Sequence, residues 1–114
     1  MKTHTLNLDP LYFDLIKKNI KNLEGRLNDE KRQQFNIGDK IIFFKEPELK
    51  ESLEAIIVDK YIFSSFLEMS NTLNKADLGF ANNSKEEMIN TYRKFYSIEK
   101  EQKYGVVIFK VKTL

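Results

Sequence analysis

"IKNLEGRLND", residues 20–29, brings four charged side chains together around a single glycine. Leu23, Gly25 and Leu27 alternate with Glu24 and Arg26, and this period of two predicts a strand with an apolar face and a polar face. On such a strand the side chains of Glu24 and Arg26 stand about 6–7 Å apart at their bases. The stretch therefore predicts a carboxylate and a guanidinium that can pair or share a ligand.

The residues before this stretch predict how the chain enters it. Residues 3–8 alternate as THTLNL and indicate a first strand. Asp9 and Pro10 form an N-cap followed by proline at the first helical position, which predicts a helix ending near Asn19. Asparagine tolerates the left-handed backbone with which helices often end. Lys21 then lies in a turn, where its side chain can lean over the face of Glu24 and Arg26.

The first half of the downstream sequence predicts two more strands. Residues 29–35 suit a helical turn with Phe35 inward, and residues 38–39, Gly-Asp, mark a turn before the strand KIIFFK at 40–45. That strand is apolar on both faces, so we expect it to be buried on both. After a charged loop at 46–54, residues 55–63 form a long β-branched and aromatic strand.

The second half predicts two capped helices and a closing strand. Ser65 with Glu68, and Ser84 with Glu87, have the spacing of capping boxes. Residues 74–83 between the two helices are rich in turn formers. The last strand, 104–112, is expected to turn Val107, Phe109 and Val111 toward the core and Lys110 and Lys112 outward.

This element order predicts an α+β fold, a small mixed β-barrel of five to six strands with three to four short helices. The strands are too closely spaced for helical crossovers throughout, and closure into a barrel removes exposed edges. A length of 114 residues predicts one domain spanning 1–114.

Composition excludes several classes of function. The chain has no cysteine and one histidine, His4, so we expect neither disulfides nor a metal site, and no cofactor. His4 itself is interpreted as an ordinary strand residue. No apolar run is long enough for a membrane span, and the start MKTHTLNLDP lacks a signal sequence, so we expect a cytoplasmic protein without a membrane partner. The net charge of +2 does not by itself indicate a nucleic-acid binder.

Two interpretations of the charged stretch follow from the residues. Alternating charges on a strand are most simply an ordinary solvated face with weak pairing, and spacing alone favours this interpretation. The other is a site in which Lys21, Glu24 and Arg26 share a polar ligand such as a base or a phosphate. Similarly, the aromatic side chains at Tyr92, Phe95, Tyr96 and Tyr104 fit a base-stacking platform, but their helical spacing is more typical of a core.

The stretch resembles the motif G-x-K-x-x-E-x-R of the ASCH domain family (activating signal cointegrator homology), a branch of the PUA-like superfamily. Lys21, Glu24 and Arg26 match the motif, and Asn19 replaces its leading glycine. "FNIGDKIIFF" at 35–44 and the closing "YGVVIFKV" resemble the corresponding family segments, so the resemblance covers nearly the whole chain.

The resemblance implies a PUA-like barrel with a cleft that binds single-stranded RNA or a nucleotide-like ligand. Phosphates would be met by Lys21, Arg26 and Arg32, with Lys17 or Lys18 as further candidates. The predicted ligand-binding residues are Lys21, Glu24, Arg26, Asn28, Arg32 and Tyr96.

The resemblance also implies an enzymatic alternative. One branch of the family hydrolyses N4-acetylcytidine with the motif lysine, a threonine at the acidic position and a later glutamate, and other members are linked to ribonuclease activity. Here Glu24 stands at the threonine position, and only Asp77 is found where the later glutamate is expected. A different hydrolysis would use Lys21 to stabilise an oxyanion and Glu24 as general base. A third possibility is a module that binds a regulatory partner.

Overall fold

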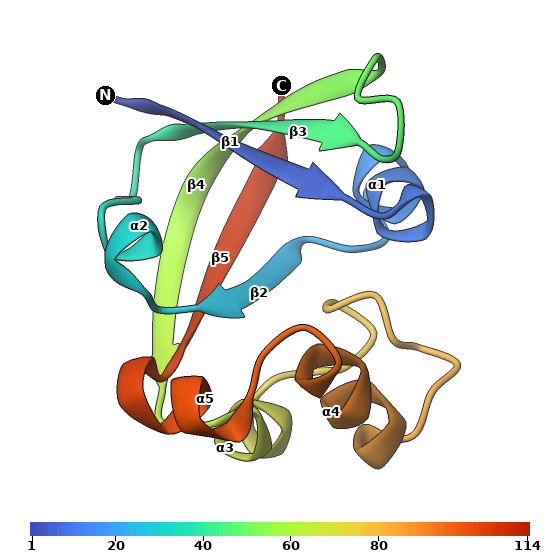
Figure 1. Cartoon of the computed structure of the whole chain (residues 1–114). Helices are drawn as coiled ribbons and strands as arrows, with labels where there is room; N and C mark the ends of the chain where they lie inside the picture. The colour runs from blue at the N-terminus through green and yellow to red at the C-terminus, as the bar shows by residue number, and fades with distance from the viewer.

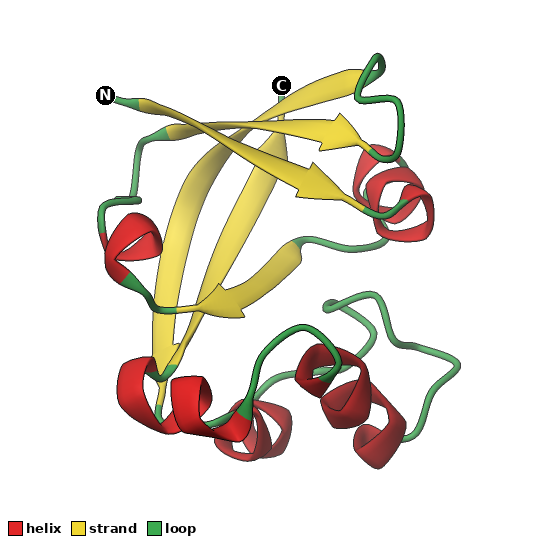
Figure 2. Ribbon diagram, viewed as in Figure 1, coloured by secondary structure: helices red, strands yellow, loops and turns green.

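One strongly curled mixed sheet forms the frame of the molecule in the computed structural model, which describes residues 1–114 (Figure 1). Helices pack outside the curl and at one end of it (Figure 2). The strands are β1 (Thr3–Leu8), β2 (Leu23–Leu27), β3 (Lys40–Lys45), β4 (Ser52–Phe63) and β5 (Val106–Thr113). The helices are α1 (Pro10–Lys17), α2 (Glu30–Gln33), α3 (Phe66–Thr72), α4 (Lys85–Arg93) and α5 (Ile98–Tyr104).

The strand order is β1-β3-β4-β5-β2, so the first two strands of the chain form the two edges of the sheet. β1 runs parallel to β3, and all other pairs are antiparallel. The sheet curls until its edges approach each other, and the Arg26 Nη2 atom of β2 donates to the Asn7 carbonyl of β1 over 2.8 Å. The fold is therefore the predicted α+β mixed barrel, left half open between β1 and β2.

Two hydrophobic clusters fill the fold because β5 is buried on both faces. Val107, Phe109 and Val111 point into the first cluster, as predicted, with residues from β1, α1, β3 and β4. Val106 and Ile108 point into the second cluster, with residues from β2, α3, α4 and the connection between these helices. The second cluster attaches α3 and α4 to one end of the curled sheet, and α5 joins them through Glu101, which accepts from the backbone N–H of Phe66 and from Arg93 (Figure 1).

Most of the local signals for helix starts and ends act as the sequence predicts. The Asp9 side chain accepts from the backbone N–H of Leu11, and Pro10 is the first residue of α1. Asn19 adopts the left-handed backbone, with φ of 61°, directly after the helix. Ser84 and Glu87 form a full capping box, whereas Ser65 caps α3 without the reciprocal bond because the Glu68 carboxylate accepts from Ser64 instead.

The structure corrects three expectations. β3 is fully buried only at Ile41 and Phe43, because its other face is partly open to solvent. β4 begins at Ser52, inside the expected loop, because it pairs with β3 along that length. There are five helices rather than three to four, since α4 ends at Arg93 and the side chain of Ser97 caps a separate helix, α5. No helix is long and apolar enough to cross a membrane.

Candidate functional site

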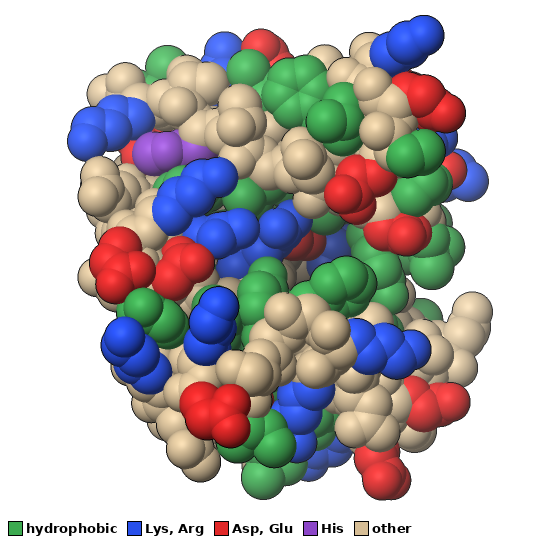
Figure 3. All heavy atoms as spheres, viewed as in Figure 1, with side chains coloured by type: hydrophobic (Ala, Val, Ile, Leu, Met, Phe, Trp, Pro, Cys, Tyr) green, Lys and Arg blue, Asp and Glu red, His purple; other side chains and the backbone are tan.

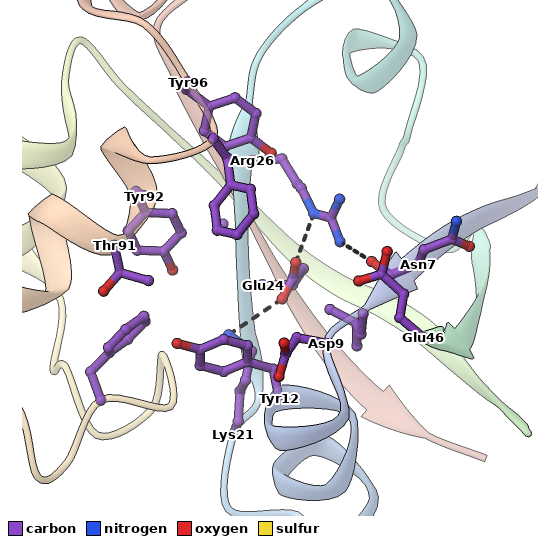
Figure 4. A pocket seen from close by; sticks show the side chains of 14 residues that line it. Asn7, Asp9, Tyr12, Lys21, Glu24, Arg26, Glu46, Thr91, Tyr92 and Tyr96 are labelled. Atoms are coloured by element: carbon purple, nitrogen blue, oxygen red, sulfur yellow. Dashed lines mark hydrogen bonds and ion pairs between the residues drawn. The ribbon is translucent and has the colours of Figure 1, made fainter. Parts of the chain in front are cut away.

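A cleft of about 390 Å³ opens beside β2, between the start of α1 on one side and the end of α4 on the other (Figure 4). Its lining comes from five parts of the chain that the fold brings together. The lining residues are Asn7, Leu8, Asp9, Tyr12, Lys21, Glu24, Gly25, Arg26, Glu46, Phe80, Thr91, Tyr92, Phe95 and Tyr96.

Lys21 is buried at the bottom of this cleft, with 3% of its surface exposed. Its ammonium donates to the carbonyl oxygens of Leu23 and Leu78, each over 2.7 Å, and lies 3.3 Å from Glu24 Oε1. An ammonium has three N–H donors, so these three partners satisfy it. Burial lowers the pKa of Lys21, although the neighbouring Glu24 opposes that effect. Lys21 thus holds Glu24 and the 74–83 connection in place.

Glu24 lies between two cations and is 5% exposed. Its Oε1 atom faces Lys21, and its Oε2 atom accepts from Arg26 Nε over 2.7 Å (Figure 4). Burial alone would raise the pKa of Glu24, but the charges of Lys21 and Arg26 outweigh burial and hold the pKa below its ordinary value. Glu24 is therefore a fixed carboxylate and a weak base.

Arg26 is the motif residue with donors to spare. Its Nε donates to Glu24 and its Nη2 donates to the Asn7 carbonyl. The two N–H groups of Nη1 take part in neither of these hydrogen bonds. The hydroxyl of Tyr96 lies beside this side chain (Figure 4). A guanidinium carries five N–H donors in a rigid plane, so Arg26 can present the remainder to a planar ligand in the cleft.

The cleft carries more negative than positive charge. Two cations, Lys21 and Arg26, face three carboxylates, Asp9, Glu24 and Glu46. Both cations already bind Glu24. The depth of the cleft therefore suits an uncharged polar group better than a phosphate.

Aromatic side chains form the opposite wall. Tyr92 is packed in the second core cluster, stacked on Phe66 at 4.7 Å between ring centroids, and its hydroxyl end reaches the cleft. Burial raises the pKa of Tyr92 well above its ordinary value, and Glu24 adds to this effect, so the phenol stays neutral. Phe95, in contrast, is 74% exposed at the cleft. The core interpretation of the aromatic side chains therefore holds for Tyr92, whereas the exposed ring of Phe95 is available for stacking.

Two glycines make room for this arrangement. A Cβ at Gly25 would lie 3.0 Å from the Tyr92 hydroxyl and 3.0 Å from Ile108 Cδ1. A Cβ at Gly79 would lie 3.0 Å from the side chain of Lys21, and Gly79 also has a φ of +93°. Gly25 thus admits Tyr92 against β2 between Glu24 and Arg26, which explains why the charges surround a glycine.

The structure brings Lys21, Glu24, Arg26 and Tyr96 together in the cleft and leaves Asn28 and Arg32 outside its lining. Arg32 binds the Asp29 carboxylate over 2.9 Å. Of the further phosphate candidates, Lys17 is paired with Glu51 and lies outside the cleft. Tyr104 is also elsewhere, with its hydroxyl on Glu30.

Sequence reasoning missed several lining residues, all outside the motif. Sequence reasoning identified Asp9 only as a helix cap and gave Tyr12 no role in the site, yet both reach the cleft from α1 and its start. Glu46 and Phe80 lie in loops whose path no local pattern predicts. The Asp-Pro helix start directly after a strand was the one usable signal, because it places Asp9 at the edge where β1 ends. No group of three or more His, Asp or Glu side chains is arranged to hold a metal ion.

The half-open mixed barrel is consistent with a PUA-like fold. The sequence matches the ASCH domain family over residues 6–114, so the chain belongs to that family, as the resemblance at Lys21, Glu24 and Arg26 indicated. ASCH domains are generally RNA-binding.

Two solved structures are similar over all or nearly all of their length. Hypothetical protein PH0355, known from a crystal structure, is 38% identical with a TM-score of 0.87, and the match covers 100% of both chains. Protein PF0455 from Pyrococcus furiosus, determined by NMR in solution, is 37% identical with a TM-score of 0.72 and covers 100% of this chain and 98% of that chain. No curated protein matches the sequence.

Proposed function

We propose that this protein binds single-stranded RNA or a nucleotide-like ligand by taking one base into the cleft beside Glu24 and Arg26. The observation that carries the proposal is an aromatic-walled cleft that ends on a fixed carboxylate and a guanidinium with free donors. A volume of 390 Å³ is at the lower end of the roughly 300–1,000 Å³ of small-ligand sites, which suits a single nucleoside.

The chemistry of the lining fits a base better than a phosphate. A base is uncharged and planar, so the surplus of carboxylates in the cleft does not repel it. Free N–H groups of Arg26 can meet ring nitrogens and carbonyl oxygens, and Phe95 can stack on the face of the ring. The neutral phenol of Tyr92 supplies a further donor at the same wall.

The geometry supports binding over hydrolysis. A general base needs an accessible oxygen and a pKa near the working pH, whereas both oxygens of Glu24 are paired and its pKa is lowered. All three N–H groups of the Lys21 ammonium have partners, so no donor is left for an oxyanion. We expect no release of cytidine from N4-acetylcytidine above the rate without protein.

Binding can be tested by fluorescence anisotropy with short labelled single-stranded RNAs and by calorimetry with the four ribonucleoside monophosphates. We expect Arg26→Lys to weaken binding about tenfold, because an ammonium keeps the charge but loses the planar fork. Phe95→Ala is expected to weaken it at least about fivefold through loss of stacking, which is worth about 1–3 kcal/mol per base.

Lys112→Ala is the matched control, since Lys112 is exposed on β5 and lies outside the cleft. Circular dichroism and thermal unfolding establish that each variant is folded. If folded Arg26→Lys and Phe95→Ala bind both kinds of probe as tightly as the Lys112→Ala control, the cleft is not the binding site and the proposal is wrong.

A further inference from the structure

The edge of β1 that faces the opening of the barrel carries backbone groups that no other strand pairs. Lys40 N–H donates to the Lys2 carbonyl, and Glu46 N–H donates to the Leu8 carbonyl, so the even-numbered residues of β1 face β3. In a parallel ladder alternate residues bond to the same neighbour, so the backbone groups of Thr3, Thr5 and Asn7 face away from it. No strand pairs with that side of β1.

A second hollow, of about 590 Å³, lies along this free edge. Thr3 and Thr5 line it together with His4, and α2 contributes Lys31 to the opposite side. The His4 ring stacks on Phe35 at 3.9 Å between centroids, and both residues line the hollow. The next residue of the same edge, Asn7, lines the cleft and receives Arg26. The two hollows therefore follow one strand edge of about 13 Å from residue 3 to residue 7.

The charges of the two hollows are opposite. The cleft has three carboxylates, whereas no carboxylate lines the hollow beside β1. Lys2 and Lys31 line this hollow, and neither makes an ion pair. His4 is the only other ionisable side chain of the lining, and it is hydrogen-bonded to Asp39 over 2.8 Å. Figure 3 shows Lys and Arg side chains gathered between the histidine and the centre of this face.

From this continuity and this charge we propose that the free edge of β1 with Lys2 and Lys31 binds the phosphate backbone of the strand whose base occupies the cleft. The inference rests on the proposed function and specifies its ligand as a strand of several nucleotides rather than a free nucleotide. Two unpaired ammonium groups, threonine hydroxyls and backbone N–H groups are donors that phosphate oxygens accept. A peptide strand added to the edge would leave both lysines without a counter-charge.

The test compares mononucleotides with oligonucleotides. Wild type is titrated with ribonucleoside monophosphates and with labelled mixed-sequence pentaribonucleotides at two or more salt concentrations. We expect the pentanucleotides to bind at least about tenfold more tightly at low salt. The double variant Lys2→Ala/Lys31→Ala should lose most of that advantage and reduce the slope of log K against log salt by about 1.4, which corresponds to two phosphate contacts. Its affinity for mononucleotides should stay that of wild type.

The matched control is Lys110→Ala/Lys112→Ala, which removes the same charge from exposed positions on β5 outside both hollows. Equal losses in the two double variants would mean that only net charge matters, and the inference would be wrong. Pentanucleotides that bind no more tightly than mononucleotides would also overturn it, while leaving base binding in the cleft intact. If neither kind of probe binds, the proposed function and this inference fail together.

Discussion

Replacing Glu24 by glutamine gives a direct test of the buried ion pairs. The Glu24 carboxylate serves two cations, Lys21 at 3.3 Å and Arg26 at 2.7 Å, and the side chain of Lys21 is 3% exposed. Glutamine keeps the shape but carries no charge, and its NH2 group replaces one of the two oxygens, so either Lys21 or Arg26 faces a donor instead of an acceptor. The Glu24→Gln variant therefore leaves a buried ammonium without a counter-charge.

The expected cost is large for a change that adds or removes no volume. Removing one partner of a buried ion pair typically costs about 3–5 kcal/mol, which is a substantial part of the roughly 5–15 kcal/mol that stabilises a domain. For a chain of this size we expect the melting temperature to fall by about 10–20 °C. The exposed pair of Lys40 and Glu54 provides the control, and Glu54→Gln should cost less than about 1 kcal/mol.

The pH dependence of the unfolding free energy tests whether the unpaired Lys21 ammonium causes the loss of stability in Glu24→Gln. In the folded wild type burial holds the pKa of Lys21 below its ordinary value of 10.5, so the unfolded chain binds more protons just below that pH and stability rises with pH there. Without Glu24 the pKa of Lys21 falls further, and this window extends to lower pH. The difference in unfolding free energy between Glu24→Gln and wild type should therefore narrow as the pH rises from about 7 to 10.

Urea unfolding followed by circular dichroism at several pH values measures these differences. The double variant Lys21→Met/Glu24→Gln completes the double-mutant cycle. We expect its loss of unfolding free energy to be smaller, by about 2–3 kcal/mol, than the losses of Lys21→Met and Glu24→Gln added together. A Glu24→Gln protein within about 1 kcal/mol of wild type at pH 7, or one whose deficit does not change with pH, would refute the reasoning.

Three further predictions concern stability. Gly25→Ala should cost about 1–3 kcal/mol in urea unfolding, because the new methyl group meets the Tyr92 hydroxyl at 3.0 Å; an unchanged midpoint would contradict this. Glu101 is 3% exposed, and its carboxylate accepts from the N-terminal backbone of α3 and from Arg93. Glu101→Gln should therefore cost about 1–3 kcal/mol, whereas a variant as stable as wild type would show that these bonds add nothing. Asp39 accepts from two backbone N–H groups and His4, which hold its pKa well below the ordinary 3.8, so its contribution is present above about pH 4 and is lost as the pH falls. Asp39→Asn should flatten the loss of melting temperature in acid, and parallel curves for variant and wild type would exclude this explanation.

Local patterns predicted the region around the motif because its signals are local. Alternation defined β1 and β2, and the Asp9 cap and the backbone tolerance of Asn19 bounded α1. The pairing of Glu24 with Arg26 followed from their two-residue spacing on one strand.

The burial of the motif could not be predicted in this way. Periodicity assigned Glu24 to a polar face exposed to solvent, but α4 and the 74–83 connection cover that end of β2. The buried Lys21 ammonium donates to the carbonyl oxygen of Leu78, which is 57 residues away in the chain. No sequence pattern predicts this contact. Similarly, the sequence predicts no separate helix after Arg93, because the helical spacing of Tyr92, Phe95 and Tyr96 continues past that residue; the cap at Ser97 is seen only in the structure.

The bonds of Lys21 affect how losses of function should be interpreted. This side chain joins β2 to the connection between α3 and α4 through two carbonyl oxygens, Leu23 and Leu78. Removing the Lys21 side chain changes the charge of the cleft. It also removes a hydrogen bond that holds the 74–83 connection, which contributes Phe80 to the lining. A Lys21→Ala protein that no longer binds or reacts is therefore no evidence that the ammonium touches the ligand. In this protein a motif lysine that would ordinarily be interpreted as a reactive group also connects two parts of the fold by hydrogen bonds. Only variants that keep these hydrogen bonds can separate the two roles.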